Sequence, residues 1–445
     1  MSNAPLICFY FQVHQPYRLR DLRVRDIGKE NIEYFDDVKN AAIFRKVAEK
    51  CYLPANKMML ELLEEHPEFA ISYSLSGVFM DQCEAYGPDV LESFKALAKT
   101  GRVEFLAETY YHSLSSMKSL PEFCEQVTKH VKKIQQHFGQ TPRIFRNTEL
   151  IFNNEIAQMA RLMGFSGIIA EGADHLLNGR TPNIPYAPPS FRLSPDKEKI
   201  IRENRPLEKR SSDIHILLKN YRLSDDIAFR FSDRNWASFP LFADTYGDWL
   251  GQNQGHSINL FMDYETFGEH QWADTGIFDF LRALPHTLKQ RGMRTATPSE
   301  VLDLWKAEHT DTYDVHNTIS WADMERDLSA WLGNHIQRSA MDAIYALEKD
   351  IKETGDAELL ETWRKLTTSD HFYYMCTKYW SDGDVHKYFS PYESPYEAYR
   401  RFSHALCDLK TRLNQREHRY TDDTIINKTT DKEYIPMSMS ASKTI

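Results

Sequence analysis

The sequence predicts an α/β fold built on a parallel sheet, and three observations lead to this expectation. Strand-like and helix-like segments alternate over about the first 310 residues. The first strand-like run, residues 6–11, is continuously apolar and ends in polar residues, as a strand buried on both faces does. Residues typical of helix starts and helix ends lie between the strands. Pro54 suits the first turn of a helix, and Gly101 suits the position after the last turn of another. Repeated βα units of this length imply a parallel sheet, either open or closed.

Each element follows from a local pattern. Residues 58–63 carry an apolar stripe at helical spacing, and residues 297–300 have the N-cap, first-turn proline and capping-box glutamate of a helix start. The expected strands are 6–11, 69–74, 103–107, 143–147, 165–170 and 257–262. The expected helices are 54–66, 89–99, 121–137, 154–163, 274–290 and 298–308.

Two composition shifts divide the chain. Residues 171–223 are rich in Pro, Asn, Arg and Lys and contain one strand-like run, so we expect a long insertion that acts as a lid or binding loop. The strands stop near residue 315, which predicts a first domain over 1–315 and a helical domain over 316–415. From residue 416 to 445 the chain is polar and rich in Thr, Ser and Lys, which predicts a mobile tail.

Composition excludes several classes of protein. The 445 residues include 54 Lys and Arg against 64 Asp and Glu, so a net charge of −10 argues against nucleic acid or an anionic membrane as the main partner. The six cysteines are scattered without zinc-ligand spacing, which fits a reducing compartment. No signal-peptide pattern or spanning apolar run is present, so we expect a cytoplasmic protein. Aromatic residues make up 13% of the chain, an unusually large share, although core packing accounts for most of them individually. The oligomeric state stays open.

Two acidic residues stand at the ends of predicted strands and are the strongest catalytic candidates. Glu149 follows the strand at 143–147, and Asp263 follows the strand at 257–262. Because the carboxyl ends of parallel strands open onto one face, both side chains can meet over one pocket. A single acid at a strand end is more often structural. A pair about 5 to 5.5 Å apart performs glycosidic bond cleavage with retention, with one acid as nucleophile and the other as proton donor.

The neighbours of the two acids suggest which acid has which role. Arg146 would keep Glu149 ionised, as a nucleophile must be. Glu265 would raise the pKa of Asp263 by repulsion between like charges, as a proton donor requires.

Further polar groups are expected on the same face of the sheet. His14 follows the first strand, and His112 follows the strand at 103–107. Gln82 lies near the start of the helix after the second strand and would reach the rim. Each of the three is a candidate substrate contact, and so are Arg146 and Glu265. A hydrogen-bonded scaffold role is the more common one for a histidine after a strand.

The helical part of the chain contains an aromatic and acidic block at residues 321–334. Trp321 and Trp331 are candidate stacking platforms for sugar rings, and Asp323 is a candidate partner for sugar hydroxyls. Burial in a hydrophobic core is the alternative role for the two tryptophans.

Taken in order, five segments resemble glycoside hydrolase family 57, the family of α-amylases and 4-α-glucanotransferases. The third and fourth segments are long enough to make the resemblance specific. The segments are His14-Gln15-Pro16, residues 77–82, Asn147-Thr148-Glu149-Leu150, residues 262–270 and residues 297–301.

The resemblance implies an incomplete (β/α)7 barrel over residues 1–315, closed by the helical domain, and a retaining mechanism with Glu149 as nucleophile and Asp263 as general acid/base. It implies cleavage of α-1,4 bonds in starch, glycogen or maltodextrins, most like the α-amylase group, with no metal or cofactor. Related enzymes often have a glutamate where this chain has Asp81-Gln82, so a subsite role for Gln82 is in doubt.

Three alternatives remain open at this stage. A 4-α-glucanotransferase uses the same covalent intermediate and passes the sugar to another sugar hydroxyl. A metal-dependent hydrolase or deacetylase could place His14, His112, Asp263 and His270 around an ion, although no two histidines have the spacing of a ligand pair. A non-catalytic glucan-binding protein would keep the aromatic residues but would have no use for the two acids.

Overall fold

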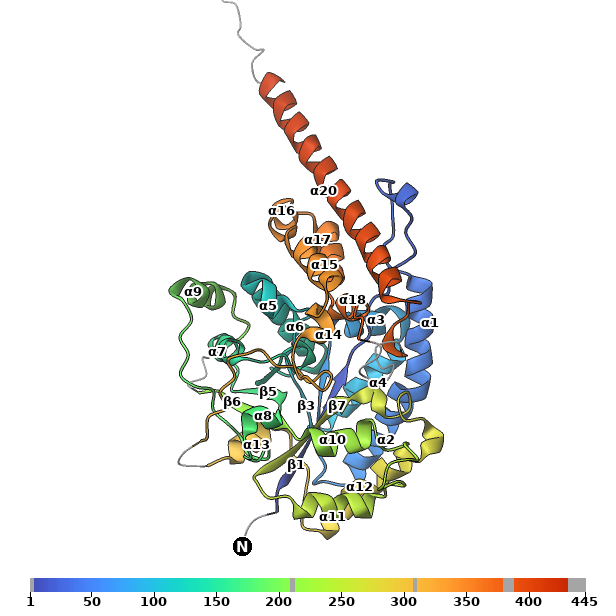
Figure 1. Cartoon of the computed structure of the whole chain (residues 1–445), viewed down its shortest axis with the longest axis vertical. Helices are drawn as coiled ribbons and strands as arrows, with labels where there is room; N and C mark the ends of the chain where they lie inside the picture. Colours follow the sequence, from blue (N-terminus) through green and yellow to red (C-terminus); the bar gives the residue numbers. More distant parts are fainter. Residues whose placement is uncertain (1–3, 209–212, 307–309, 379–387, 431–445) are drawn as a thin grey trace, which may run out of the picture.

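Seven parallel strands form the centre of the molecule and bring the candidate residues together (Figure 1). The computed structural model describes residues 4–208, 213–306, 310–378 and 388–430. One sheet has the strand order β3-β2-β1-β7, and the other has the order β4-β5-β6. The strands are β1 (Leu6–Val13), β2 (Ile71–Leu75), β3 (Val103–Phe105), β4 (Ile144–Arg146), β5 (Gly167–Glu171), β6 (His215–Lys219) and β7 (Ser257–Asp263).

The two sheets meet at two seams and form an incomplete barrel. At the β3/β4 seam, Ala107 pairs with Phe145, and the Arg146 amide donates to the Ala107 carbonyl at 2.8 Å. At the β6/β7 seam, the Asn220 amide donates to the Asn259 carbonyl at 2.9 Å. The spatial order of the strands is therefore their order along the chain, which confirms the expected incomplete (β/α)7 barrel.

Helices cover the outside of the barrel, as right-handed βα connections require. Several begin or end where the sequence patterns predicted, while α1, α5, α8, α9, α10 and α11 were not among the expected helices. The helices of this part are α1 (Asp37–Val47), α2 (Leu53–Glu65), α3 (Gly77–Tyr86), α4 (Pro88–Lys99), α5 (Ser115–Lys118), α6 (Leu120–Phe138), α7 (Asn154–Met163), α8 (Asp174–Leu177), α9 (Pro195–Asn204), α10 (Tyr221–Ala228), α11 (Ala243–Gln252), α12 (Ile277–Gln290) and α13 (Pro298–Leu304).

Capping explains the agreement at α7, whose bounds are those predicted. The side chain of Asn153 accepts a hydrogen bond from the Ile156 amide at the first turn. Gly164 ends the helix in the left-handed region with φ 105°, where glycine has no side chain to clash.

The segment 171–223 contains more regular structure than an insertion loop. It contains α8, α9 and the strand β6, which pairs with β5 from Gly167↔His215 to Glu171↔Lys219. The strand-like run at 214–218 is thus part of the barrel wall. Only the stretch before it is an excursion from the βα pattern.

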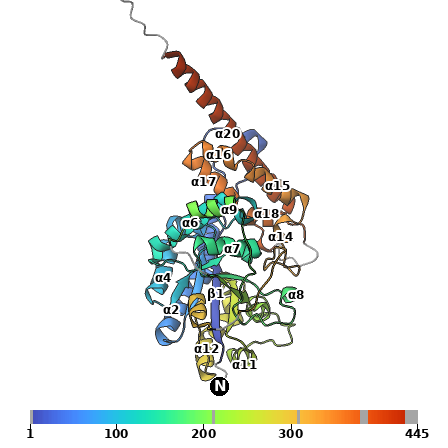
Figure 2. The same cartoon turned by 90° about the vertical axis from the view of Figure 1, so that its left-hand side faces the viewer.

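The C-terminal helices pack on the end of the barrel toward which β1 runs (Figures 1 and 2). Trp331, Trp363 and Phe402 share one hydrophobic core with barrel residues such as Phe123. The helices are α14 (Ser329–Leu332), α15 (His335–Tyr345), α16 (Glu348–Glu353), α17 (Ala357–Leu366), α18 (Ser369–Tyr373) and α20 (Pro395–Thr430).

The expected tail begins inside α20, which runs on to Thr430, and residues 431–445 lie outside the described part of the chain. Among the described residues, no helix combines the length and the apolar character that crossing a bilayer demands.

Candidate active site

A cavity of about 490 Å³ opens at the carboxyl ends of the strands, between the barrel and the C-terminal helices. Its volume is within the usual range for small-molecule sites. The barrel contributes side chains that follow β1, β3, β4, β6 and β7, and the C-terminal part contributes Trp321, Asp323, Trp331 and Asp370. Both predicted acids, Glu149 and Asp263, line this cavity.

Glu149 stands on a strained turn directly after β4. The φ angles of Glu149 and Leu150 are positive, at 58° and 50°. Non-glycine residues rarely adopt this conformation, and the residues that do so are concentrated at functional sites. The carboxylate accepts hydrogen bonds from His112 Nε2 at 3.0 Å and Trp321 Nε1 at 2.6 Å. Its side chain is 20% exposed, so it remains open to a ligand.

These contacts set the charge of Glu149. Burial alone would raise its pKa, but the hydrogen bond and charge of His112, followed by the charge of Arg146, outweigh burial and lower the pKa below its usual value. The sequence predicted a role for Arg146, and His112 adds the larger effect.

Asp263, at the end of β7, has the opposite environment. It pairs in register with Gln12 of β1 and is half-buried. Within the described part of the chain, no hydrogen bond reaches its carboxyl group. Burial first, and then the negative charge of Glu149, raise the pKa of Asp263 to about 6.

The predicted direction of the pKa shift of Asp263 is right, but the like charge with the larger effect is that of Glu149 and not that of Glu265. The Tyr52 hydroxyl donates a hydrogen bond to the Glu265 carboxylate. Burial, and then the charge of Asp263, raise the pKa of Glu265 itself to about 8. Glu265 still lines the cavity.

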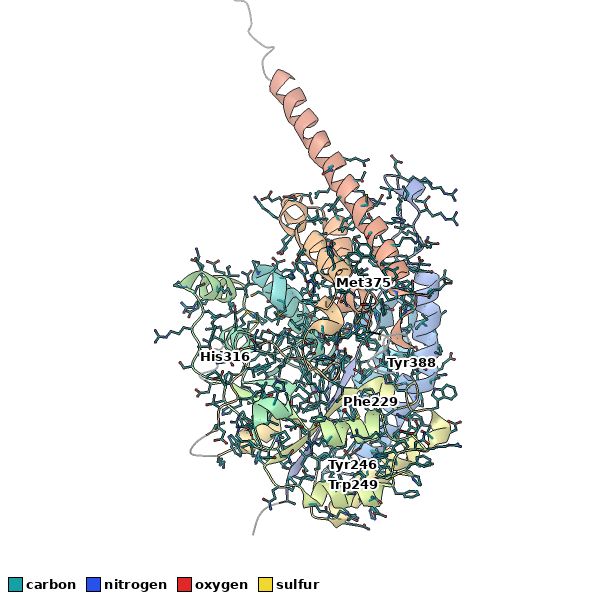
Figure 3. The ribbon with its side chains drawn as sticks, in the orientation of Figure 1. Phe229, Tyr246, Trp249, His316, Met375 and Tyr388 are labelled. Carbon is teal, nitrogen blue, oxygen red and sulfur yellow. The ribbon has the colours of Figure 1, made fainter. Side chains whose placement is uncertain are left out.

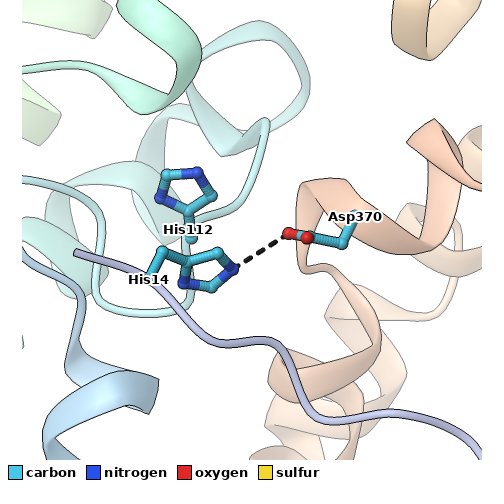
Figure 4. A group of neighbouring side chains, drawn as sticks. All are labelled: His14, His112 and Asp370. Atoms are coloured by element: carbon cyan, nitrogen blue, oxygen red, sulfur yellow. Dashed lines mark hydrogen bonds and ion pairs between the residues drawn. The ribbon is translucent and has the colours of Figure 1, made fainter. Parts of the chain in front are cut away.

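His14 and His112 lie face to face beside the two acids. Their ring centroids are 4.0 Å apart, and His14 Nε2 contacts the Asp370 carboxylate at 2.9 Å (Figure 4). His14 Nδ1 is 2.7 Å from the Ser76 hydroxyl. Burial and the charge of His112 lower the pKa of His14, so a neutral ring that accepts from Ser76 and donates to Asp370 fits this geometry.

Among the described residues, one group has a composition and spacing that could suit a metal ion. It consists of His14, His112 and Asp370, whose ligand atoms lie within 4.8 Å of one another. Every ring nitrogen in the group already has a protein partner: Ser76 and Asp370 for His14, and two carboxylates for His112. We therefore do not assign a metal to it. Asp263 and His270, which the metal-dependent alternative required, are not part of this group.

Trp321, from the C-terminal part of the chain, contacts Glu149 and lines the same cavity as Asp263. Its ring is flanked by two cations, with the Arg146 guanidinium 5.3 Å and the Lys219 ammonium 5.4 Å from the ring centroid. Its main-chain amide donates to the Glu149 carbonyl at 3.2 Å. The ring is therefore fixed in the wall of the cavity.

Asp323 and Trp331, the other two candidates from residues 321–334, differ in how far they take part in the cavity. Asp323 lines the cavity with φ 55° and is 3.3 Å from Lys378 Nζ. Trp331 touches the cavity but is 1% exposed and belongs to the hydrophobic core, so packing is its main role.

Gln82 is not a wall residue of the cavity, which corrects its predicted place at the rim. It is fully buried, and its Nε2 donates to the Gln15 carbonyl at 2.6 Å. The helix α3 carries it behind the loop that follows β1, where it supports that loop.

Three residues at or beside the cavity were missed by the sequence reasoning. Glu108 hydrogen-bonds His112 at 2.9 Å, Lys219 lines the cavity at the end of β6, and Asp370 contacts His14. The strand-like run at 214–218 was a usable signal for Lys219. Nothing near Asp370 in the sequence connects it with the barrel.

The fold and the site together place two carboxyl groups at one cavity, with the pKa of Glu149 lowered and the pKa of Asp263 raised. The family description "Glycosyl hydrolase family 57" matches residues 8–316. The chain belongs to this family, which confirms the resemblance seen in the sequence.

A relative from Methanocaldococcus jannaschii, with the name "Putative alpha-amylase", is 43% identical over 418 residues, covering 91% of this chain and 84% of that protein. A branching enzyme from Pyrococcus horikoshii has a similar structure, with a TM-score of 0.59 at 14% identity over 84% of this chain and 85% of that one. A 4-alpha-glucanotransferase from Thermococcus litoralis gives 0.58 at 15% identity, and the match spans 84% of this chain but 56% of that one. At these identities the two structures support the fold alone.

Proposed function

We propose that this protein is a retaining glycoside hydrolase that cleaves α-1,4-glucosidic bonds in starch, glycogen or maltodextrins. The observation that carries the proposal is the opposite shift of two pKa values at one cavity, lowered for Glu149 and raised to about 6 for Asp263. Retaining glycosidases need this pair of states, an ionised nucleophile and a protonated acid.

The proposed reaction has two steps. Glu149 attacks the anomeric carbon, the glycosidic bond breaks, and Asp263 gives its proton to the leaving oxygen. The sugar is then bound to Glu149 as an ester, and Asp263 is ionised. Asp263 next takes a proton from water, whose oxygen attacks the same carbon and releases Glu149, so that both acids return to their first states.

The mouth of the cavity supports a sugar chain as substrate. Phe229, Met324 and Phe389 line it, and each has its side chain exposed to solvent. Phe229, labelled in Figure 3, is 60% exposed. Aromatic faces stack on neutral glucose rings, and an acidic chain suits a substrate without negative charge.

Glucan transfer is the second candidate, because relatives from Thermococcus litoralis and Thermococcus kodakarensis have the name 4-alpha-glucanotransferase. These matches cover 29% of this chain and 19% of each relative. A transferase shares the first step and replaces water by a sugar hydroxyl in the second.

A product time course on maltoheptaose, with and without a chelator, tests the proposal. We expect shorter maltodextrins and a matching gain in reducing ends, unchanged by the chelator. Chains longer than seven glucose units, formed without that gain, would favour the transferase. Loss of activity with the chelator and recovery with zinc would favour a metal-dependent hydrolase.

A further inference from the structure

Glu108 is a buried carboxylate that does not line the cavity itself but contacts residues that do. It follows β3 and has no exposed surface. Its Oε1 accepts hydrogen bonds from Ser74 Oγ at 2.6 Å and Gln12 Nε2 at 3.1 Å. Its Oε2 lies 2.9 Å from His112 Nδ1 and 3.7 Å from Arg146 Nη1.

His112 connects this carboxylate to Glu149. One ring nitrogen faces Glu108 Oε2 at 2.9 Å, and the other faces Glu149 Oε1 at 3.0 Å. Ionised carboxylates only accept hydrogen bonds, so both ring nitrogens must be donors, and the ring between them must be an imidazolium. A neutral ring could satisfy only one of the two carboxylates.

We propose that Glu108 is a positioning residue for the reaction: it fixes the ring of His112 so that Nε2 donates to Glu149 and holds the nucleophile in place. This inference rests on the proposed function. An acid that orients a histidine, which in turn acts on the reacting group, is a recurring arrangement in enzymes. Here the histidine anchors a nucleophilic carboxylate and does not transfer its proton.

The burial of Glu108 fits this role better than a packing role. A buried carboxylate is costly unless it is hydrogen-bonded and paired, and two of its partners, Ser74 and Gln12, come from neighbouring strands. Those strands fix the carboxylate rigidly. The ring that it orients is therefore fixed with respect to the barrel as well.

The charges around His112 are consistent with an imidazolium. Burial lowers the pKa of His112, but the hydrogen bonds to Glu108 and Glu149 outweigh it and raise the pKa to about 9. The charge of Arg146, whose Nη1 is 3.5 Å from His112 Nδ1, opposes a positive charge on the ring. The ring of His14 stacks on that of His112, and Asp370, from α18, faces His14. Asp263 lies close enough for the charges of His112 and Glu149 to act on its pKa.

Glu108→Gln tests the proposal, because it keeps the size and one acceptor but removes the charge. Without that charge the ring of His112 loses its proton near neutral pH, so the pKa of Glu149 rises. We expect the acidic limb of the kcat/KM profile to move to higher pH and kcat at pH 7 to fall about 10- to 100-fold. In the background of His112→Gln, the same substitution should cost no further activity.

Glu104→Gln is the matched control. Glu104 lies on β3, four positions before Glu108, and its carboxylate hydrogen-bonds Ser299 at the start of α13. It has no contact with His112, so we expect the limb to stay in place. An acidic limb that does not move in Glu108→Gln, or that moves equally in Glu104→Gln, overturns the proposal.

Nitrogen NMR of the histidine ring provides a readout that does not depend on catalysis. In the wild-type protein, we expect His112, assigned by comparison with His112→Gln, to remain an imidazolium at pH 7.5. In Glu108→Gln we expect a neutral ring at that pH. Wild-type His112 that titrates at or below its ordinary pKa near 6.5 overturns the inference, even where Glu108→Gln does not fold.

A wild-type protein without activity on glucans would overturn the proposed function. The NMR titration would still decide the contact between Glu108 and His112. The two failures are therefore distinguishable.

Discussion

The two sides of the cavity provide a carboxyl group with opposite electrostatic environments. On the β4 side, Glu149 receives two hydrogen bonds and faces a positive ring. On the β7 side, Asp263 is half-buried and, among the described residues, receives none. The first environment stabilises the charged form and the second disfavours it. This difference supports the proposed roles of Glu149 as nucleophile and Asp263 as proton donor.

Removing each acid gives the largest expected effect and tests the division directly. Glu149→Gln and Asp263→Asn should each reduce turnover of maltoheptaose by about 10³- to 10⁵-fold, measured as reducing ends. Oligosaccharide binding, measured by calorimetry, should change little. Unchanged turnover in either variant contradicts the assigned pair.

A substrate with a good leaving group separates the two roles. With α-maltosyl fluoride, Asp263→Asn should still release a burst of fluoride, because the first step needs little proton donation. Azide should restore its turnover by replacing the activated water. Glu149→Gln should show neither the burst nor the rescue, and a burst in that variant would reverse the assignment.

The pH profile of kcat/KM follows from the same comparison. Glu149 must be ionised, and its pKa is lowered, so activity should persist until the pH falls below the usual range of a glutamate. Asp263 must be protonated, and its pKa is raised to about 6, so activity should decline as the pH rises past about 6. Because the two acids interact, the apparent pKa values of the two limbs describe the pair and not either acid alone. Activity that increases from pH 6 to 8 would contradict the account.

Trp321→Phe tests the hydrogen bond that the C-terminal part supplies to Glu149. The variant keeps an aromatic ring but removes the Nε1 donor, so kcat should fall about 10- to 100-fold and the acidic limb should move to higher pH. Trp331→Phe is the control, because this buried ring makes no contact with Glu149. Equal kinetic losses in both variants would indicate a packing effect only.

Phe229→Ala gives the smallest expected effect and tests the mouth of the cavity. Loss of one stacking surface should raise KM for maltoheptaose about 3- to 10-fold and leave KM for an aryl maltoside unchanged. Phe242→Ala is the matched control, since Phe242 is 63% exposed but does not line the cavity. A rise in KM for both substrates, or in both variants, would argue against an outer binding site.

Much of the fold, and the position of Glu149 and Asp263 at one cavity, could be predicted from the sequence because the signals are local. The apolar strand runs, the caps of α7 and the acids at strand ends depend on residues close together in the chain. The strand β6 was hard to recognise in the sequence. Residues 171–194, which precede it, show no alternation of strand-like and helix-like runs.

The remaining features depend on distances that a sequence does not contain. Asp370 and His14 are 356 positions apart and meet only because the C-terminal helices pack on the barrel. The role of Glu265 was misjudged because proximity to Asp263 in sequence did not reveal its bond to Tyr52. Gln82 was misplaced because its position on the helix, and not its distance from the strand end, decides where its side chain points.

The most direct test of the account is the identity of the residue that carries the sugar. Asp263→Asn, incubated with α-maltosyl fluoride, should accumulate a covalent intermediate because its second step lacks a base. Peptide mass spectrometry after digestion at low pH would locate the adduct. The account predicts one maltosyl unit on Glu149, and an adduct on another residue, or none, would contradict it.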